Sequence, residues 1–206
     1  GAPPMPLQAV WTRDDGSLPP WKGDFHHDLN TQMTYLAYHA AGLGDAGRSF
    51  LDYNWALLPT YREFARSFYG AEGAVVPGVA TLGGKPTGGW AQYALSPTSG
   101  LWVGHSFHLH WRYTMDRQFL ETRAYPWLAD IATGVANLLE ERDGRLYLPL
   151  SSSPEIHDNS LRAWLTPNSN HDLALMRWAF TALAEMAADL ERPDDIAKWR
   201  GLASQL

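Results

Sequence analysis

The chain has 206 residues, a formal net charge of −6 and no cysteine. This length can bury the core of one domain, and the lack of cysteine excludes disulfides and thiolate metal sites within this chain. The acidic residues are dispersed and no basic stripe is present, which argues against a nucleic-acid partner. No apolar run approaches the roughly eighteen residues of a membrane span, so we expect no membrane partner.

The first residues do not have the pattern of a signal peptide, because no basic segment is followed by an apolar core. A mature secreted protein would have lost such a segment. The compartment therefore stays open, and the periplasm or the extracellular space is favoured if the full-length protein carries a signal peptide.

Helical patterns follow one another along the first part of the chain. Asn30 can cap a helix whose apolar positions reach Ala41, and a second helix is expected from Ala46 to Leu57. Pro59 suits an early position of a third helix, which Gly70 ends.

The second part contains longer helices and two long loops. Residues 70–95 and 143–170 predict loops, and between them we expect helices over 97–113 and 117–142, the latter broken near Pro126. Further helices are expected over 171–190 and 193–206. Helix after helix without a convincing series of strands predicts an all-α fold of the α/α toroid type, and loops of this length often carry function.

Ten tryptophans are the unusual feature of the composition. Trp offers a large flat face with one polar edge, and the C–H face of a pyranose packs well on such a surface. The alternative is that most of these residues belong to the core.

The segment 21–30 contains the pair Asp28 and Asn30, two residues apart. In an extended stretch both side chains point to the same side, and they could hold one water between a carboxylate and an amide. The alternative, which this feature alone favours, is that they cap a helix.

Glu155 follows a proline in the second long loop, among small polar residues. A general acid must keep its proton near neutral pH and needs a partly desolvated site, which an aromatic residue such as Trp164 could supply. By itself, a lone Glu in a loop is more often a solvated surface charge.

Three histidines, His105, His108 and His110, lie on one expected helix. Only the first two share a face, so their spacing matches no helix-borne zinc motif. We therefore expect no metal site, and interpret these histidines as interior or cleft residues.

Several stretches, in this order, resemble glycoside hydrolase family 95, whose best-known members are inverting α-L-fucosidases. Any one of them is weak evidence, but the ordered set spans nearly the whole chain. The stretches are Leu7-Gln8-Ala9-Val10-Trp11, Pro19-Pro20-Trp21, residues 28–35 (family "NINTEMNYW"), residues 110–116 (family "HYRYTGD"), Tyr125-Pro126, Ser153-Pro154-Glu155 (family "SPE") and residues 170–173.

The resemblance implies a fold, a mechanism and a set of site residues. It implies an (α/α)6 barrel, with the glutamate of the "SPE" loop, here Glu155, as general acid. It also implies a pair of asparagines that orient the hydrolytic water, at positions matched here by Asp28 and Asn30. No cofactor is implied, and the expected partner is an oligosaccharide or other glycan.

This sequence departs from the family pattern at two points. Asp28 stands where the family has the first asparagine, and a carboxylate could itself act as general base. The family's own base is an aspartate further along the chain, and no segment before Leu206 matches it. The patterns predict about six or seven helices, roughly half of the barrel, so we interpret residues 1–206 as part of a single catalytic domain whose open flank is covered by the rest of the barrel or by a partner.

The resulting hypothesis is hydrolysis of a terminal sugar, α-L-fucose first, with inversion. Glu155 donates a proton to the leaving oxygen, and Asp28 and Asn30 position or activate a water on the other face of the sugar. If Asp28 is the base, its carboxyl group is expected about 6.5–9.5 Å from that of Glu155, which leaves room for the water. We expect Trp21, His27, Trp90, Trp164 and His108 or His110 to line the cleft. The alternatives are a related glycosidase acting on another sugar, such as α-L-galactose, and a non-catalytic carbohydrate-binding helical domain.

Overall fold

Helices make up most of the computed structural model, which describes residues 3–9, 13–18, 20–153, 156, 160–164 and 168–206. The α-helices are α1 (Asn30–Thr34), α2 (Ala37–Ala40), α3 (Gly44–Ala56), α4 (Leu58–Phe64), α5 (Ala91–Ala94), α6 (Ser99–Thr114), α7 (Arg117–Phe119), α8 (Tyr125–Ala136), α9 (Asn170–Asp189) and α10 (Pro193–Ser204). Shorter elements are the 3-10 helices η1 (Pro20–Gly23) and η4 (Leu161–Trp164), the π-helical turns η2 (Ala65–Tyr69) and η3 (Leu120–Ala124), and the strands β1 (Phe25–His26), β2 (Val79–Ala80), β3 (Glu140–Arg142) and β4 (Arg145–Tyr147).

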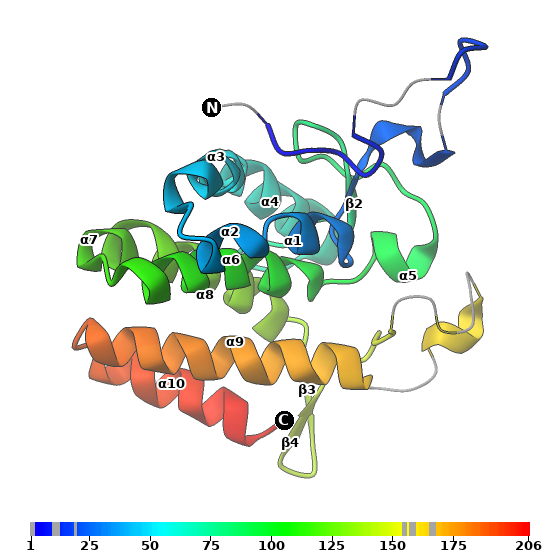
Figure 1. The fold of residues 1–206 in the computed structure, drawn as a ribbon. Coiled ribbons are helices and arrows are strands. Elements are labelled where there is room, and N and C mark those ends of the chain that lie inside the picture. Colours follow the sequence, from blue (N-terminus) through cyan, green and yellow to red (C-terminus); the bar gives the residue numbers. More distant parts are fainter. Residues whose placement is uncertain (1–2, 10–12, 19, 154–155, 157–159, 165–167) are drawn as a thin grey trace.

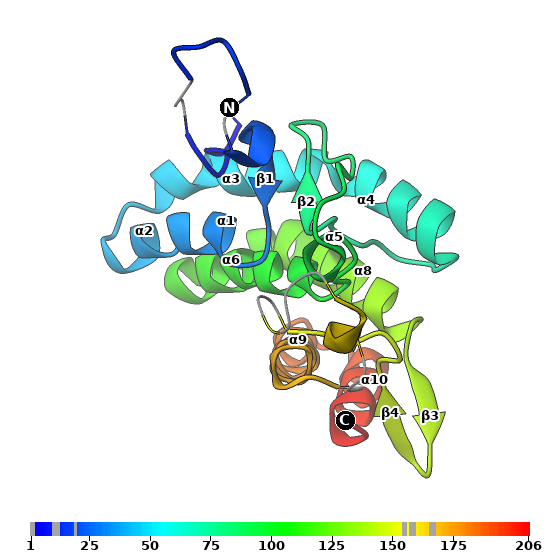
Figure 2. The ribbon, with the colours of Figure 1, turned by 90° about the vertical axis from the view of Figure 1, so that its right-hand side faces the viewer.

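The helices pack as two layers (Figure 1). The view of Figure 2 shows α1, α2, α6 and α9 toward one side and α4, α8 and α10 toward the other. Helix α6 lies in the middle and contacts α1, α2, α3, α8 and α9, while α10 packs along α9. This is the paired-helix arrangement that the sequence pattern predicts.

Large apolar side chains fill the space between the layers. Trp111, Trp127 and Trp199 are almost fully buried, so these tryptophans belong to the core. Phe107 of α6 stacks on Trp127 of α8 with ring centroids 4.6 Å apart. The indole N–H of Trp199 donates to the hydroxyl of Tyr125 at 3.0 Å, which satisfies the one polar atom of that ring.

Glycines on α6 and α8 allow unusually close packing. A Cβ on Gly104 would lie 2.5 Å from Cδ1 of Leu128 on α8. A Cβ on Gly134 would lie 2.3 Å from the carbonyl oxygen of Ala74, in the segment that crosses α8. The chain therefore needs glycine at these helical positions for steric reasons, despite its low helix propensity.

The first residues of α1, α6 and α9 lie at the same end of the molecule (Figure 1). Two side-chain contacts link these ends: Gln32 Nε2 donates to the Ser99 carbonyl at 3.4 Å, and Thr98 Oγ1 donates to Asp172 at 2.6 Å. The long segments that precede α6 and α9 therefore meet at this end.

The structure corrects several expected boundaries. The helix over 117–142 ends at Ala136, and residues 140–147 form the β3–β4 hairpin instead. The expected break near Pro126 corresponds to the boundary between the π-helical turn η3, which ends at Ala124, and α8, which begins at Tyr125. Pro126 lies in the first turn of α8, where a missing N–H costs nothing. The first expected helix is divided into α1 and α2. The N-cap residue of α1 is Leu29, and no side chain makes a capping hydrogen bond there, so Asn30 is not a capping residue.

Within the described residues, no helix combines the length and the apolar character that crossing a lipid bilayer requires.

Candidate active site

The segment before α1 is held in place by a short antiparallel pairing. β1 pairs with β2, and the N–H of His27 donates to the Gly78 carbonyl at 2.8 Å. Gly78 itself lies so close to α5 that a Cβ there would be 1.7 Å from the Tyr93 carbonyl oxygen. Residues 25–28 are therefore fixed against α5, which carries Tyr93, and against Trp90 at its N-cap.

A cavity of about 170 Å³ opens where these segments meet. It contains a carboxylate, an amide, an imidazole and three aromatic rings. Its lining consists of Leu7, Trp21, His26, Asp28, Asn30, Trp90 and Tyr93. Four residues expected from the sequence, Trp21, Asp28, Asn30 and Trp90, thus come together at one cavity.

Asp28 and Asn30 do not lie in an extended stretch. Asp28 lies in the turn between β1 and α1, and Asn30 is the first residue of α1. Asp28 is only 8% exposed, and its Oδ1 has no hydrogen-bond partner among the described residues. A buried carboxylate oxygen without a protein donor is suited to holding a water or a sugar hydroxyl.

Trp21 is presented by strained backbone. Trp21 and Lys22 both have left-handed conformations, with φ of 61° and 58°. Such conformations are costly for residues with a Cβ and occur preferentially at ligand sites. The Trp21 ring is 48% exposed and meets His26 edge to face, with centroids 5.4 Å apart.

His26 is a cavity residue that sequence reasoning did not single out. Its Nδ1 lies 2.7 Å from Asp24 Oδ1, and this contact orients the ring. Burial raises the pKa of Asp24, while His26 acts in the opposite direction. His26 and His27 are adjacent in the sequence, and either side chain could have faced the cavity. The β1–β2 register decides that the His26 side chain does so.

His27, which was expected in the lining, does not line this cavity. Its side chain is 1% exposed and stacks on Phe25, with centroids 6.5 Å apart. Burial lowers the pKa of His27 to about 4, so the ring is neutral at physiological pH. His27 directly follows the last residue of β1, and its ring lies on the Phe25 side while the His26 ring faces the cavity.

His108 and His110 also lie elsewhere. His108 packs against Trp178 of α9 and lies 3.6 Å from Glu185, facing the α6–α9 interface. His110 lies near the end of α6, in another cavity with His39 and Tyr113. The long helix α6 carries both residues away from its N-terminal end, where Asp28 lies.

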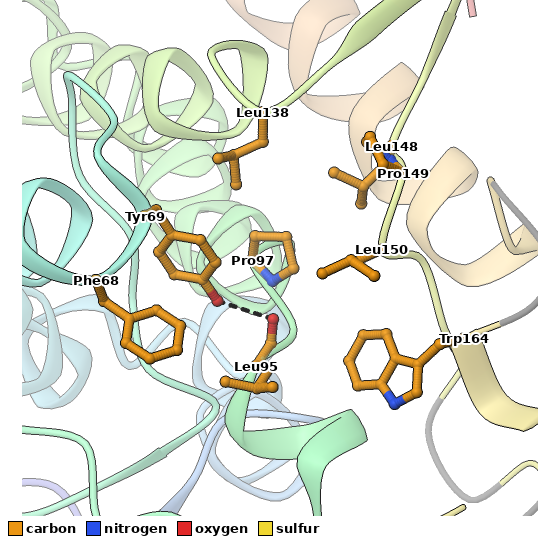
Figure 3. A pocket seen from close by; sticks show the side chains of 9 residues that line it. All are labelled: Phe68, Tyr69, Leu95, Pro97, Leu138, Leu148, Pro149, Leu150 and Trp164. Atoms are coloured by element: carbon orange, nitrogen blue, oxygen red, sulfur yellow. Dashed lines mark hydrogen bonds between the residues drawn. The ribbon is translucent and has the colours of Figure 1, made fainter. Parts of the chain in front are cut away.

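Trp164 lines a separate cavity of about 390 Å³ with apolar walls (Figure 3). Its neighbours there include Phe68 and Leu150, and the Tyr69 hydroxyl donates to the Leu95 carbonyl at 2.8 Å. Trp164 thus does not join Trp21 and Trp90. Glu155, expected as the general acid, lies outside the described residues.

A larger cavity adjoins the one that Asp28 and Asn30 line. It measures about 450 Å³ and shares Trp21 and Trp90 with the Asp28 cavity, while Lys22, Asp24 and Gly88–Gly89 contribute polar groups and backbone. The two tryptophans therefore flank a path that continues beyond the small cavity.

The first turn of α9 adds one polar residue, His171, near Asp28. Burial lowers the pKa of His171, while the carboxylates of Asp172 and Asp28 act to raise it, so His171 lies within electrostatic reach of both. Asp172 is 1% exposed and hydrogen-bonded. Within the described chain, no group of three or more His, Asp or Glu side chains is arranged to hold a metal ion.

Comparison with known proteins identifies the family. The model of the glycosyl hydrolase family 95 catalytic domain matches residues 1–206. The chain is 30% identical to alpha-L-fucosidase 2 of Arabidopsis thaliana over 97% of its own length, and 30% identical to a protein named probable alpha-fucosidase A of Aspergillus niger over 75%. It spans 24% and 20% of the length of these relatives.

A solved structure described as a kojibiose phosphorylase from the human microbiome superposes with a TM-score of 0.76. The superposition covers 98% of this chain and 27% of the other, at 12% identity, so it informs on the fold alone. That structure belongs to a family of α/α barrels, which confirms an all-α fold of this type, present in part. The chain belongs to glycoside hydrolase family 95.

Proposed function

We propose that this chain is part of a single inverting glycoside hydrolase domain that releases a terminal sugar, with α-L-fucose as the first candidate. The observation that carries the proposal is the cavity in which Asp28 and Asn30 lie together with Trp21 and Trp90. The names of the two relatives, both fucosidases, support the choice of sugar.

In this mechanism Glu155 protonates the glycosidic oxygen while the bond from that oxygen to the anomeric carbon breaks. A water attacks the same carbon from the opposite face and loses one proton to a base. Asn30 orients this water through its amide. The Oδ1 of Asp28, which has no hydrogen-bond partner among the described residues, is suited either to accept the proton or to hold the water for a base that lies further along the protein.

The aromatic residues support a carbohydrate ligand. Trp21 is half exposed at the cavity, and Trp90 stacks on Tyr93 with centroids 5.8 Å apart, which holds its ring in place. A preordered ring face binds a sugar at little cost in side-chain entropy.

The decisive experiment offers the full-length protein a panel of fucosylated and α-L-galactosylated oligosaccharides. Wild type is expected to release one monosaccharide with inverted anomeric configuration, followed by NMR. Glu155→Gln is expected to lower kcat by about 100-fold to 10,000-fold, the usual contribution of a general acid. Equal glycan binding by both proteins without any release would instead identify a binding domain.

The same panel decides the role of Asp28. If Asp28 is the base, Asp28→Asn lowers kcat by about 100-fold or more, because an amide cannot accept the proton. If Asp28 only positions the water, the asparagine variant keeps most of the wild-type activity, since it restores the residue that the family has here. Release of galactose rather than fucose would change the substrate without changing the class.

A further inference from the structure

Asp172 forms the centre of a buried hydrogen-bond network at the start of α9. Its Oδ1 accepts from the Thr98 hydroxyl at 2.6 Å, just before α6. Its Oδ2 accepts from the Ser151 hydroxyl at 2.7 Å and from the Ser152 N–H at 3.1 Å. One carboxylate thus joins α9, the start of α6 and the loop that leads into Glu155.

Ser169 makes two further hydrogen bonds to the same loop. Its N–H donates to the Ser151 hydroxyl at 2.7 Å, and its own hydroxyl donates to the Ser152 carbonyl at 2.8 Å. Ser151 and Ser152 are 0% and 5% exposed. The backbone at residues 151–152 is therefore held by α9 with almost no access to solvent.

This arrangement differs from an ordinary helix cap. Ser169 and Asp172 have the spacing of a capping box, and the Asp172 N–H does donate to the Ser169 hydroxyl, at 3.2 Å. In a capping box, however, the acidic side chain returns to the N–H of the cap residue. Here that N–H is bonded to Ser151, and the Asp172 carboxylate faces the loop and Thr98 instead.

We propose that Asp172 is a positioning residue, which fixes the Ser151-Ser152 backbone and thereby sets where Glu155, three residues further on, delivers its proton. This inference rests on the proposed role of Glu155 as general acid. A misplacement of about 1 Å in such a group can cost about 100-fold in rate, which is sufficient reason for a buried carboxylate with several donors at this point.

The test compares two substrates with the full-length protein: an oligosaccharide that wild type hydrolyses, and the glycosyl fluoride of the same sugar. An alkoxide leaving group needs a proton from the acid, whereas fluoride departs with much less help. Asp172→Asn and Ser151→Ala are expected to lower kcat on the oligosaccharide by about 100-fold, and on the fluoride by only a few fold.

Thr98→Val provides the matched control. It removes a hydrogen bond to the same carboxylate, but from α6 and not from the loop, and it keeps the shape of a fully buried side chain. It is expected to lower the melting temperature while the ratio of the two kcat values stays at the wild-type level. A purely structural role of Asp172 would make all three variants alike.

Measuring Glu155→Gln on the same two substrates distinguishes a failure of the positioning role from a failure of the proposed function. If it shows the fluoride preference while Asp172→Asn and Ser151→Ala do not, the positioning role is overturned and the proposed function stands. If Glu155→Gln hydrolyses the oligosaccharide as well as wild type does, both proposals are overturned. Equal losses on both substrates in Asp172→Asn and Ser151→Ala would also overturn the positioning role.

Discussion

At the scale of single residues, the site combines groups that water would normally satisfy with backbone that is costly to maintain. Asp28 Oδ1 is buried and without a donor in the described chain, and Trp21 has a left-handed backbone. Both features cost stability. Their meeting at one cavity is the physical argument that this region binds a ligand.

Buried histidines predict how stability changes with pH. Burial lowers the pKa of both His27 and His39 to about 4, from an ordinary value of 6.5. Between these two pH values the unfolded chain binds protons that the folded chain does not. Stability is therefore expected to fall as the pH drops from 6.5 to about 4, and this contribution stops changing below that.

The variant His27→Phe tests this at one residue. It keeps an aromatic ring against Phe25 but cannot titrate. Relative to the variant, wild type is expected to lose up to about 3 kcal/mol of unfolding free energy between pH 6.5 and 4, measured by denaturant titrations. Parallel curves for the two proteins would show that His27 is protonated while folded.

At the scale of elements, the packing of α8 depends on glycine more than on helix propensity. Gly134 lies against the backbone of Ala74, which cannot move aside as a side chain could. Gly201 of α10 has nothing within 4 Å of its missing Cβ. Glycine has the same intrinsic helix propensity at both positions, and only the atoms that surround the two residues differ.

Alanine at these two positions should therefore have opposite effects. Gly134→Ala is expected to destabilise the full-length protein by about 1–3 kcal/mol through steric overlap. Gly201→Ala is expected to stabilise it by up to about 1 kcal/mol, because alanine favours the helix. Thermal unfolding measures both, and a stabilising Gly134→Ala would refute the close approach of α8 and residue 74.

The elements also show where sequence patterns succeed. The cores of α3, α6, α9 and α10 fall within the expected helices, because each has an apolar stripe long enough to define its period. The β3–β4 hairpin was not predicted, since its three-residue strands are too short to show alternation. The same short length hid β1 and β2, whose pairing decides which of His26 and His27 faces the cavity.

At the scale of the whole molecule, one exposed apolar stripe, which runs from the residue before α1 to the residue before α2, points to a larger assembly. Leu29, Met33 and Leu36 follow helical spacing and are 43%, 53% and 40% exposed. The two relatives are each about four times as long as this chain, by the shares of both chains that the matches cover. We expect the remainder of the catalytic domain to cover this stripe.

Introducing a charged side chain into this apolar stripe tests whether the rest of the domain covers it. Met33→Lys should lower the stability of the full-length protein by about 1–3 kcal/mol, the value of burying one large apolar side chain. Met115→Lys, at a methionine that is 63% exposed and off the stripe, should have little effect and serves as control. Equal melting temperatures for the two variants would show that the stripe faces solvent.

Local sequence patterns were sufficient to predict the all-α fold and the family, because helical periods and ordered motifs are local properties of the chain. They also selected Trp21, Asp28, Asn30 and Trp90, which the structure brings to one cavity. The tertiary structure was needed to show that His26 and not His27 lines this cavity, that His110 and Trp164 line other cavities while His108 packs against α9, and that Asp172 is hydrogen-bonded to the loop before Glu155. These facts depend on strand register and on contacts between residues more than 20 positions apart, which no local pattern encodes.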